Sequence, residues 1–238
     1  MRWLRFYTPQ ALSEQASVSL DEASRHHMVQ VLRIRQGERV TLFNGDGYDY
    51  HGKVALLDRK QVVVVLETAE RVERESSLDL SVYVCVLKNE TMDRVIQKAV
   101  ELGVKRIVPV RCERMEWRGD EHKKHQHWQG IIQASAMQCG RAVLPELSPI
   151  RAFAEVVSAE HALRLIFTPH HESQQSALPK QAESVGVWIG CEGGFSPQEV
   201  QAALAAGWQV GHLGKRILRA DTAAIVAMAQ VQSWYGDM

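Results

Sequence analysis

A glycine-rich segment near the carboxyl terminus has the composition of a ligand-binding loop. It runs from Ile189 to Pro197 with the sequence IGCEGGFSP, between an apolar strand-like stretch and a helix-like one. Three glycines in five positions let backbone amides and carbonyls approach a ligand with no Cβ in the way. Ligands of open α/β sheets collect at such places, outside the carboxyl end of a strand. A turn that merely needs positive φ is the alternative at this point.

The loop fits none of the common nucleotide-binding motifs. No Gly-Lys-Ser/Thr follows it, as a P-loop requires, and its spacing and late position differ from the dinucleotide fingerprint. A Rossmann-type methyltransferase also places its glycine turn early in the chain. Ser196 is predicted to cap a helix that begins at Pro197, and Glu199 stands where a capping box needs a carboxylate.

A second loop, residues 213–224, again leads from a strand-like stretch through a glycine into a helix-like one. Three basic residues cluster before the helix, which Asp221 or Thr222 is predicted to cap. A solvated charged loop is the alternative. The apolar pair at 217–218 between the cations indicates instead that the loop folds back and covers another part of the molecule or a ligand.

The region around these loops alternates between strands and helices, which predicts an α/β fold with a largely parallel sheet covered by helices. In the clearest helix, apolar residues recur at i, i+3, i+4, i+7 and i+8, and Gly103 follows as a stop. The predicted strands cover 80–87, 107–110, 163–167, 185–189 and 209–213, and the predicted helices cover 91–102, 121–137, 197–206 and 220–234.

The first seventy or so residues predict a separate small β domain, with the short strands of a compact barrel. Asn44 to Gly47 gives a strong hairpin-turn signal, and a helix is predicted after Asp21. The strand-like runs cover 40–43, 48–57 and 62–66, and a polar connector at 71–77 separates the predicted domains, residues 1–72 and 77–238.

Bulk composition is that of an ordinary globular protein, with 45% hydrophobic and 24% charged residues. No apolar run approaches the roughly 18 residues of a membrane span, and the amino terminus lacks a signal-peptide core, so a cytosolic location is expected. The formal net charge is zero, so any electrostatic binding of nucleic acid must come from local basic surfaces. The cysteines form no C-x-x-C pair and are expected to be reduced, mostly buried thiols: Cys85, Cys112, Cys139 and Cys191.

Three histidines between 122 and 127 raise the question of a metal site. Their spacing is i, i+3 and i+5, and only the first two share a helical face. Zinc normally needs three or four convergent ligands. We therefore interpret this segment as a solvated basic face and expect no metal.

Motifs across nearly the whole chain resemble, in order, the 16S ribosomal RNA uracil-N3 methyltransferase family of the SPOUT class. The two glycine loops correspond to the family's two cofactor loops. Cys191 stands where the family usually has proline, and Asp221 replaces a usual glutamate. The matching segments are His27 to Arg33, Lys88 to Asp93, Ile96 to Val104, Pro109, Glu113-Arg114, Gln138 to Arg141, Pro145, Ile189 to Ser196 and Leu213 to Ala224.

The resemblance implies a homodimer of two-domain subunits. Each would have an amino-terminal PUA-like β-barrel that helps to hold RNA and a SPOUT α/β domain with a trefoil knot that binds S-adenosyl-L-methionine. The implied activity is methylation of N3 of a specific uridine in 16S ribosomal RNA, within the small ribosomal subunit in the cytoplasm. No membrane partner is implied.

The resemblance also assigns roles to individual residues. The catalytic candidates are Arg219, Glu192 and Arg141, and the RNA-binding candidates are Arg5, Arg33, Lys88, Arg114 and Arg141. The cofactor-binding candidates are Thr168, Ile189, Gly190, Glu192, Gly193, Leu213, Gly214, Ile217, Leu218 and Thr222.

Methyl transfer from a sulfonium depends mainly on in-line approach of the nucleophile. Uracil N3 is protonated at neutral pH, so a base must take the proton or a cation must stabilise the uracilate. The residues do not identify a general base. Two other functions stay open at this point: a non-catalytic RNA-binding assembly factor, and a related knotted enzyme that acts on transfer RNA or on ribose.

Overall fold

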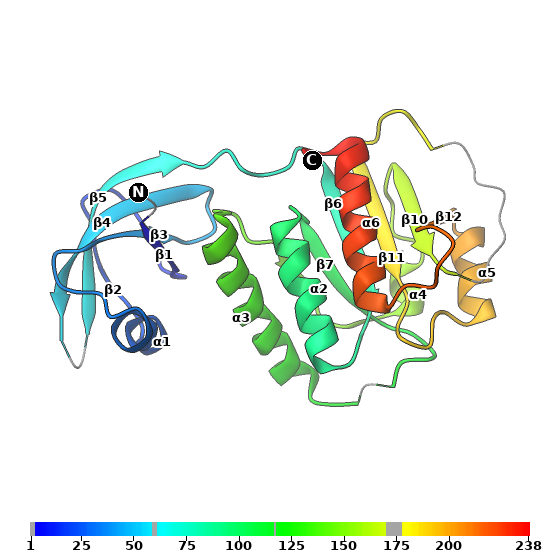
Figure 1. Ribbon diagram of the computed structural model, residues 1–238, viewed down its shortest axis with the longest axis horizontal. Coiled ribbons are helices and arrows are strands. Elements are labelled where there is room, and N and C mark those ends of the chain that lie inside the picture. Colours follow the sequence, from blue (N-terminus) through cyan, green and yellow to red (C-terminus); the bar gives the residue numbers. More distant parts are fainter. Residues whose placement is uncertain (1–2, 59–60, 117, 170–177) are drawn as a thin grey trace. The chain divides into compact units, whose positions relative to one another are not determined.

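The computed structural model describes residues 3–58, 61–116, 118–169 and 178–238 (Figure 1). The chain divides into two compact units, one of residues 1–75 and 133–144 and one of residues 76–132 and 145–238. Helix α3 (Glu121–Cys139) starts in the second unit, and its last residues belong to the first. The domain limits predicted from the sequence, 1–72 and 77–238, stay a proposal.

A five-stranded sheet in the order β1-β3-β4-β5-β2 forms the first unit. β1 runs parallel to β3, and the other neighbouring strands are antiparallel. Two of these strands, β1 and β2, are not predicted, because runs of three or four residues carry too little alternation. The bounds are β1 (Leu4–Tyr7), β2 (Ser17–Ser19), β3 (Arg39–Phe43), β4 (Tyr48–Leu57) and β5 (Val62–Arg71).

The predicted hairpin joins β3 to β4. Gly45 and Gly47 adopt φ of 96° and 94°, which a side chain would disfavour. The Asn44 side chain accepts the Asp46 N–H at 3.2 Å, and the Asp46 side chain accepts the Tyr48 N–H at 3.0 Å. The turn chemistry is therefore local, which is why the sequence predicts it correctly.

The predicted helix after Asp21 is present and is short. α1 (Glu22–His26) continues directly as a π-helical turn, η1 (His27–Val31). The Asp21 carboxylate accepts the Ser24 N–H at 2.8 Å, so the predicted capping is confirmed. Met28 is fully buried in the core of this unit.

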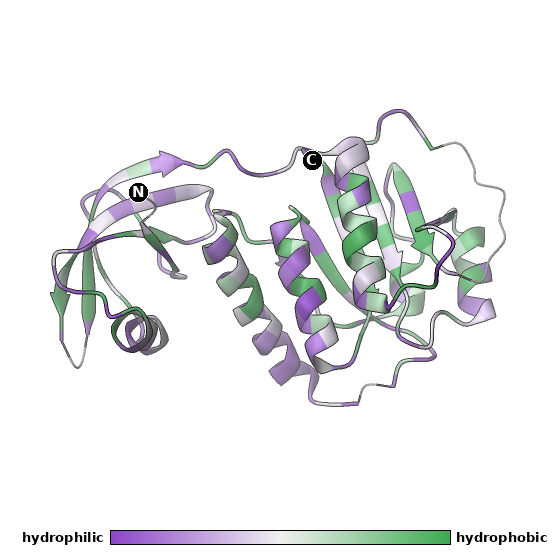
Figure 2. Ribbon diagram, in the orientation of Figure 1, coloured by the Kyte–Doolittle hydropathy of each residue, from purple (hydrophilic) through white to green (hydrophobic). Residues whose placement is uncertain are grey.

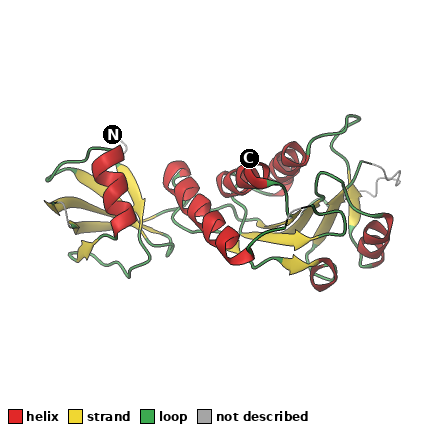
Figure 3. Ribbon diagram, turned by 90° about the horizontal axis from the view of Figure 1, so that it is seen from below, coloured by secondary structure: helices red, strands yellow, loops and turns green. Residues whose placement is uncertain are grey.

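The second unit contains a parallel sheet in the order β12-β10-β11-β6-β7-β8, with β9 paired to β7. All described strand pairs of this sheet are parallel, which confirms the predicted α/β class. Helices cover both of its faces (Figure 3), and its central strands are strongly hydrophobic (Figure 2). The trefoil knot stays a prediction.

The elements of the second unit follow the predicted order, apart from the very short β8, β9 and α4. The strands are β6 (Asp79–Cys85), β7 (Arg106–Arg111), β8 (Glu146–Leu147), β9 (Arg151–Ala152), β10 (Leu163–Phe167), β11 (Ser184–Ile189) and β12 (Gln209–Gly211). The helices besides α3 are α2 (Asn89–Glu101), α4 (Phe153–Val156), α5 (Pro197–Ala205) and α6 (Ala220–Tyr235).

Two of the four cysteines form a disulfide bond between Cys85 and Cys112, whose Cα atoms lie 5.7 Å apart. Cys85 ends β6, where the parallel register places it opposite Val110 of β7. The expectation that all four cysteines are reduced is wrong for this pair. The pairing depends on which strands are neighbours, and a sequence separation of 27 gives no sign of that. Cys139 and Cys191 are free.

Removing this disulfide should lower the free energy of unfolding by roughly 3 kcal/mol, because the link restricts the unfolded chain. Urea unfolding of the oxidised protein, of the protein in dithiothreitol and of a variant with Cys85→Ser and Cys112→Ser measures the effect. The variant should match the reduced protein and should not respond to dithiothreitol. Equal stability of the oxidised and reduced wild type would show that the bond does not form in solution.

Candidate active site

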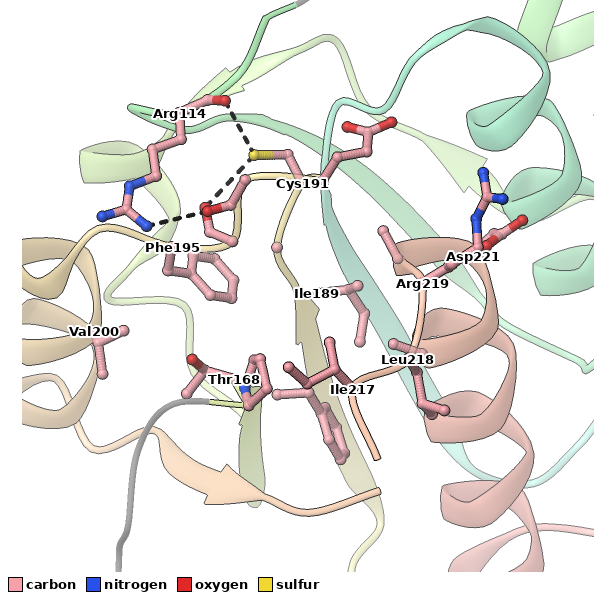
Figure 4. A pocket seen from close by; sticks show the side chains of 18 of the residues that line it. Arg114, Thr168, Ile189, Cys191, Phe195, Val200, Ile217, Leu218, Arg219 and Asp221 are labelled. Atoms are coloured by element: carbon pink, nitrogen blue, oxygen red, sulfur yellow. Dashed lines mark hydrogen bonds between the residues drawn. The ribbon is translucent and has the colours of Figure 1, made fainter. Parts of the chain in front are cut away.

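A cavity of about 700 Å³ lies in the second unit, beyond the carboxyl ends of β10 and β11 (Figure 4). A smaller cavity of about 110 Å³ shares part of its wall. Parallel strands end at one edge of a sheet, so the loops that follow them meet there. The larger cavity is lined by residues 167–169, by the first glycine loop and by the second loop between 217 and 223. The two loops predicted to share a ligand therefore lie together.

The first glycine loop is held open by local structure. The Ser196 hydroxyl accepts the Glu199 N–H at 3.2 Å, and the Glu199 carboxylate accepts the Ser196 N–H at 2.9 Å, so the predicted capping box is confirmed. Gly194 has φ of 68°, and its N–H donates to the Cys191 carbonyl at 2.9 Å. A Cβ at Gly194 would meet no atom within 4 Å. Gly194 therefore lines the cavity with a bare backbone.

Arg114, which follows β7, closes one side of this loop (Figure 4). Its Nη1 donates to the Gly193 carbonyl at 3.1 Å, and its own carbonyl accepts the Cys191 thiol at 3.3 Å. Burial raises the pKa of the Cys191 thiol, which keeps the proton available for donation. The thiol also reaches the Gly194 carbonyl at 3.5 Å. These contacts tie Cys191, Gly193 and Gly194 to the segment that follows β7 and to one another.

Glu192 and Lys88, predicted for catalysis and for RNA binding, are engaged with the chain itself. The Glu192 carboxylate accepts the Lys88 N–H at 3.1 Å. The Lys88 ammonium pairs with the Glu116 carboxylate, and this hydrogen bond raises the pKa of Lys88 and lowers that of Glu116. Glu192 lines the cavity, whereas Lys88 is not among the described residues that line it.

The second loop leads into α6, and the prediction that Asp221 or Thr222 caps this helix is wrong. The helix cap is Arg219, which makes no capping bond with its side chain. The Asp221 carboxylate instead accepts two bonds from Arg94 of α2, from Nε at 3.2 Å and from Nη2 at 3.0 Å. Burial opposes ionisation of Asp221, but Arg94, the Thr222 N–H and the Arg219 charge together lower its pKa. This pairing ties the second loop to α2.

The structure brings most of the predicted cofactor residues to the two cavities. Thr222 is the exception, because it lies exposed in the first turn of α6. Arg219 and Arg114 line the larger cavity as well. The predicted residues at the cavities are Thr168, Ile189, Gly190, Glu192, Gly193, Leu213, Gly214, Ile217 and Leu218.

Sequence reasoning missed several lining residues that carry no charge pattern. They are uncharged residues, most of them apolar or small, and the sequence gives no sign that sets them apart from core or turn residues. The missed residues include Thr91, Phe167, Pro169, Gly194, Phe195, Val200 and Gln201.

Three predicted residues, Arg5, Arg33 and Arg141, belong to the first unit. The Arg5 side chain is 5% exposed and pairs with Asp49, and the Arg141 side chain is 5% exposed and pairs with Glu75. Arg33 is exposed. The guanidinium groups of Arg5 and Arg141 therefore have structural partners within the chain. The RNA-binding and catalytic roles of all three arginines stay predictions.

The histidine-rich start of α3 makes ordinary contacts. His127 Nε2 lies 2.8 Å from the Asp93 carboxylate, and His125 Nε2 lies 3.3 Å from the Leu147 carbonyl. In the described ranges, no three His, Cys, Asp or Glu side chains are grouped so that they could hold a metal ion. Nor does any helix there have the length and apolar character to cross a membrane.

Fold and cavity define a class of protein: an α/β domain with a ligand pocket beyond the ends of its parallel strands, accompanied by a small β domain. Residues 74–232 match the model of an RNA methyltransferase domain, and residues 20–67 match that of an RNA methyltransferase PUA domain. The first match covers more than half of the chain. The chain belongs to this RNA methyltransferase family.

Individual relatives agree over the full length. A methyltransferase from Legionella pneumophila, solved in complex with its bound cofactor SAM, shares 35% identity and a TM-score of 0.95, with 100% of both chains covered. Ribosomal RNA small subunit methyltransferase E from Neisseria gonorrhoeae, bound to S-adenosyl methionine, shares 32% identity and a TM-score of 0.91, again with 100% of both covered. The enzyme of the same name from Buchnera aphidicola of Schizaphis graminum is 29% identical over 98% of this chain and 97% of its own.

Proposed function

We propose that this chain transfers a methyl group from S-adenosyl-L-methionine to N3 of a specific uridine in 16S ribosomal RNA. One observation carries the proposal: both loops that the family resemblance assigns to the cofactor line a single cavity. Relatives named ribosomal RNA small subunit methyltransferase E support the substrate, and two relatives with the cofactor bound support its identity. The choice of N3 rests on the resemblance.

The residues of the cavity fit a sulfonium nucleoside. A volume of about 700 Å³ lies in the usual range for small-molecule sites. Ile189, Phe195 and Leu218 offer apolar surface for the nucleoside, and the open backbone at Gly194 offers polar groups without a side chain. When bound, the cofactor supplies an electrophilic methyl group.

The chain's own task is then to place the uracil and to stabilise negative charge on it. N3 lies on the pairing edge of uracil, so the target nucleotide must be unpaired or flipped. Arg219 is exposed at the cavity, where its guanidinium would stabilise the uracilate formed when N3 loses its proton. Arg114, exposed on the opposite loop, would contact the RNA backbone.

Arg219→Ala should lower kcat by about 100-fold, because one charge-stabilising donor in a site is worth about this much. Affinity for the cofactor should stay within about twofold, since the side chain acts on the uracil. Arg219→Lys keeps the charge and should recover part of the rate. Single-turnover methylation and calorimetric titration measure the two quantities. Unchanged turnover in Arg219→Ala would remove this role for Arg219.

Nucleoside mass spectrometry of ribosomal RNA from a deletion strain tests the function as a whole. Loss of 3-methyluridine from 16S RNA, restored by the wild-type gene, is the expected result. Loss of a transfer RNA or ribose modification would favour a related knotted enzyme. An unchanged nucleoside profile, with no cofactor binding by calorimetry, would favour a non-catalytic assembly factor.

We also propose a homodimer that acts in the cytoplasm, on the small ribosomal subunit. The family resemblance suggests the dimer, and exposed apolar side chains on and near α6 support it. Val226, Trp234 and Ile217 are 39%, 41% and 73% exposed, and a second copy could cover them. Sedimentation should give twice the chain mass of 26.8 kDa, and Trp234→Glu should shift the equilibrium toward the monomer. A monomeric wild type would contradict the dimer.

A further inference from the structure

Glu199 does more than cap α5. Glu199 is 7% exposed, and each oxygen of its carboxylate accepts a backbone N–H. Oε2 takes the Ser196 N–H at 2.9 Å, which is the capping contact. Oε1 takes the Glu113 N–H at 2.8 Å, from the segment that follows β7, 86 residues away in sequence. A capping role explains the first bond and leaves the second unexplained.

The segment reached by Oε1 forms a wall of the cofactor loop. Arg114, the next residue, binds the Gly193 carbonyl through its side chain and the Cys191 thiol through its carbonyl (Figure 4). Its side chain also packs on the loop, because a Cβ at Gly193 would lie 3.3 Å from the Arg114 Cβ. Arg114 thus supports two residues of the loop, and Glu199 holds the backbone beside Arg114.

We propose that Glu199 is a positioning residue for cofactor binding, which acts by holding Arg114 against the first glycine loop. This inference rests on the proposed function, because it takes that loop as the cofactor loop. Only a carboxylate can accept at both ends. Glutamine would place an NH₂ group against one of the two N–H donors, and the buried bond to Glu113 or to Ser196 would be lost.

A purely structural role makes a different prediction. If Glu199 served only to cap α5, Ser196→Ala should disturb the cofactor site at least as much as Glu199→Gln, because Ser196→Ala removes one half of the capping box whereas glutamine can still accept the Ser196 N–H. Ser196→Ala keeps the backbone N–H of residue 196, so both oxygens of Glu199 keep their donors. Ser196→Ala is therefore the matched control.

A second variant isolates the bond without touching α5. Glu113 is the second residue of a turn closed by the Met115 N–H and the Cys112 carbonyl at 3.2 Å. Proline is favoured at this position of a turn and has no N–H. Glu113→Pro therefore deletes the donor to Glu199 and leaves the capping box intact. It also covers the case in which Glu199→Gln fails to fold.

The test compares cofactor affinity by calorimetry with thermal unfolding. Glu199→Gln and Glu113→Pro should each weaken S-adenosyl-L-methionine binding roughly tenfold, the size expected for loss of a hydrogen bond to a charged group. Ser196→Ala should change affinity less than twofold. In methylation assays the two variants should raise KM for the cofactor and keep kcat at saturating cofactor within about threefold.

Coupling to Arg114 is the decisive measurement. If Glu199 acts through Arg114, Glu113→Pro should weaken cofactor binding less in an Arg114→Ala background than in the wild type, because the side-chain contact to Gly193 is then already absent and only the carbonyl contact to Cys191 remains. Effects that multiply would overturn the proposal, as would wild-type affinity in both Glu113→Pro and Glu199→Gln. If Ser196→Ala loses as much cofactor affinity as Glu199→Gln does, Glu199 acts only as a cap of α5 and the proposal is wrong.

Amide hydrogen exchange in the cofactor-free protein separates this inference from the proposed function. The Gly194 N–H, which donates to the Cys191 carbonyl, should exchange faster in Glu113→Pro and at the wild-type rate in Ser196→Ala. Unchanged exchange at Gly194 would contradict transmission through Arg114. If the wild type binds the cofactor and methylates no ribosomal RNA, the proposed function is refuted. The effect of Glu199 on cofactor affinity and on Gly194 exchange can still be measured in that case.

Discussion

Gly194→Val is expected to raise the dissociation constant for S-adenosyl-L-methionine by about 100-fold, a loss of about 2.7 kcal/mol. Two effects combine. Gly194 holds φ of 68°, which a β-branched side chain adopts only with strain. Its Cβ position is open, so the new side chain would project into the cavity where we place the cofactor. Calorimetric titration of the variant with the cofactor measures the loss.

Gly37→Val is the matched control for this prediction. Gly37 has φ of 89°, its Cβ position also meets nothing within 4 Å, and it lies in the first unit. The same strain is therefore introduced without touching the cofactor loops. Stability should fall in both variants, and cofactor affinity only in Gly194→Val. Equal loss of affinity in the two variants would mean that general destabilisation of the protein, rather than occupied ligand space, causes the effect.

The glycine loop shows where sequence reasoning reaches its limit. The pattern IGCEGG predicts that bare backbone faces a ligand, and from the sequence alone Gly193 and Gly194 are equally good candidates for that position. In the structure a Cβ at Gly193 would face Arg114, whereas one at Gly194 would face open space. The difference depends on a segment 79 residues away in sequence, which no local pattern reveals.

The same distinction runs through the fold. Ser196 and Glu199 lie three residues apart and cap α5 as predicted, since the capping box is local. The sequence predicts Asp221 as a cap of α6 in the same way, and yet it lies inside the helix, where Arg94, 127 residues earlier, pairs with its carboxylate. Elements whose periodicity extends over ten residues are predicted within a few residues of their bounds. Pairings between distant segments need the tertiary structure.

Asp49→Ala should lower the free energy of unfolding by about 3–5 kcal/mol, the largest stability effect we expect. Asp49 accepts the Arg5 Nη2 at 2.5 Å, and the two side chains are 10% and 5% exposed. Arg5 also donates to the carbonyls of Ala136 and Arg141, so its guanidinium stays buried when the carboxylate is gone. A buried charge without its counter-ion is costly. Urea unfolding followed by circular dichroism measures the change.

A double-mutant cycle decides whether this pair is the cause. Each single variant leaves one buried charge, so Arg5→Ala with Asp49→Ala should be less destabilised than the sum of the singles by about 2 kcal/mol or more. Additive effects would contradict a coupled buried pair.

Arg33→Ala, at an exposed site of the same unit, should leave stability within about 0.5 kcal/mol of wild type. If Arg33 contacts RNA as predicted, its loss should reduce the salt dependence of RNA binding by about one phosphate contact. Because Arg5 is engaged by Asp49 and two carbonyls, we expect Arg5→Ala to act through folding of the first unit.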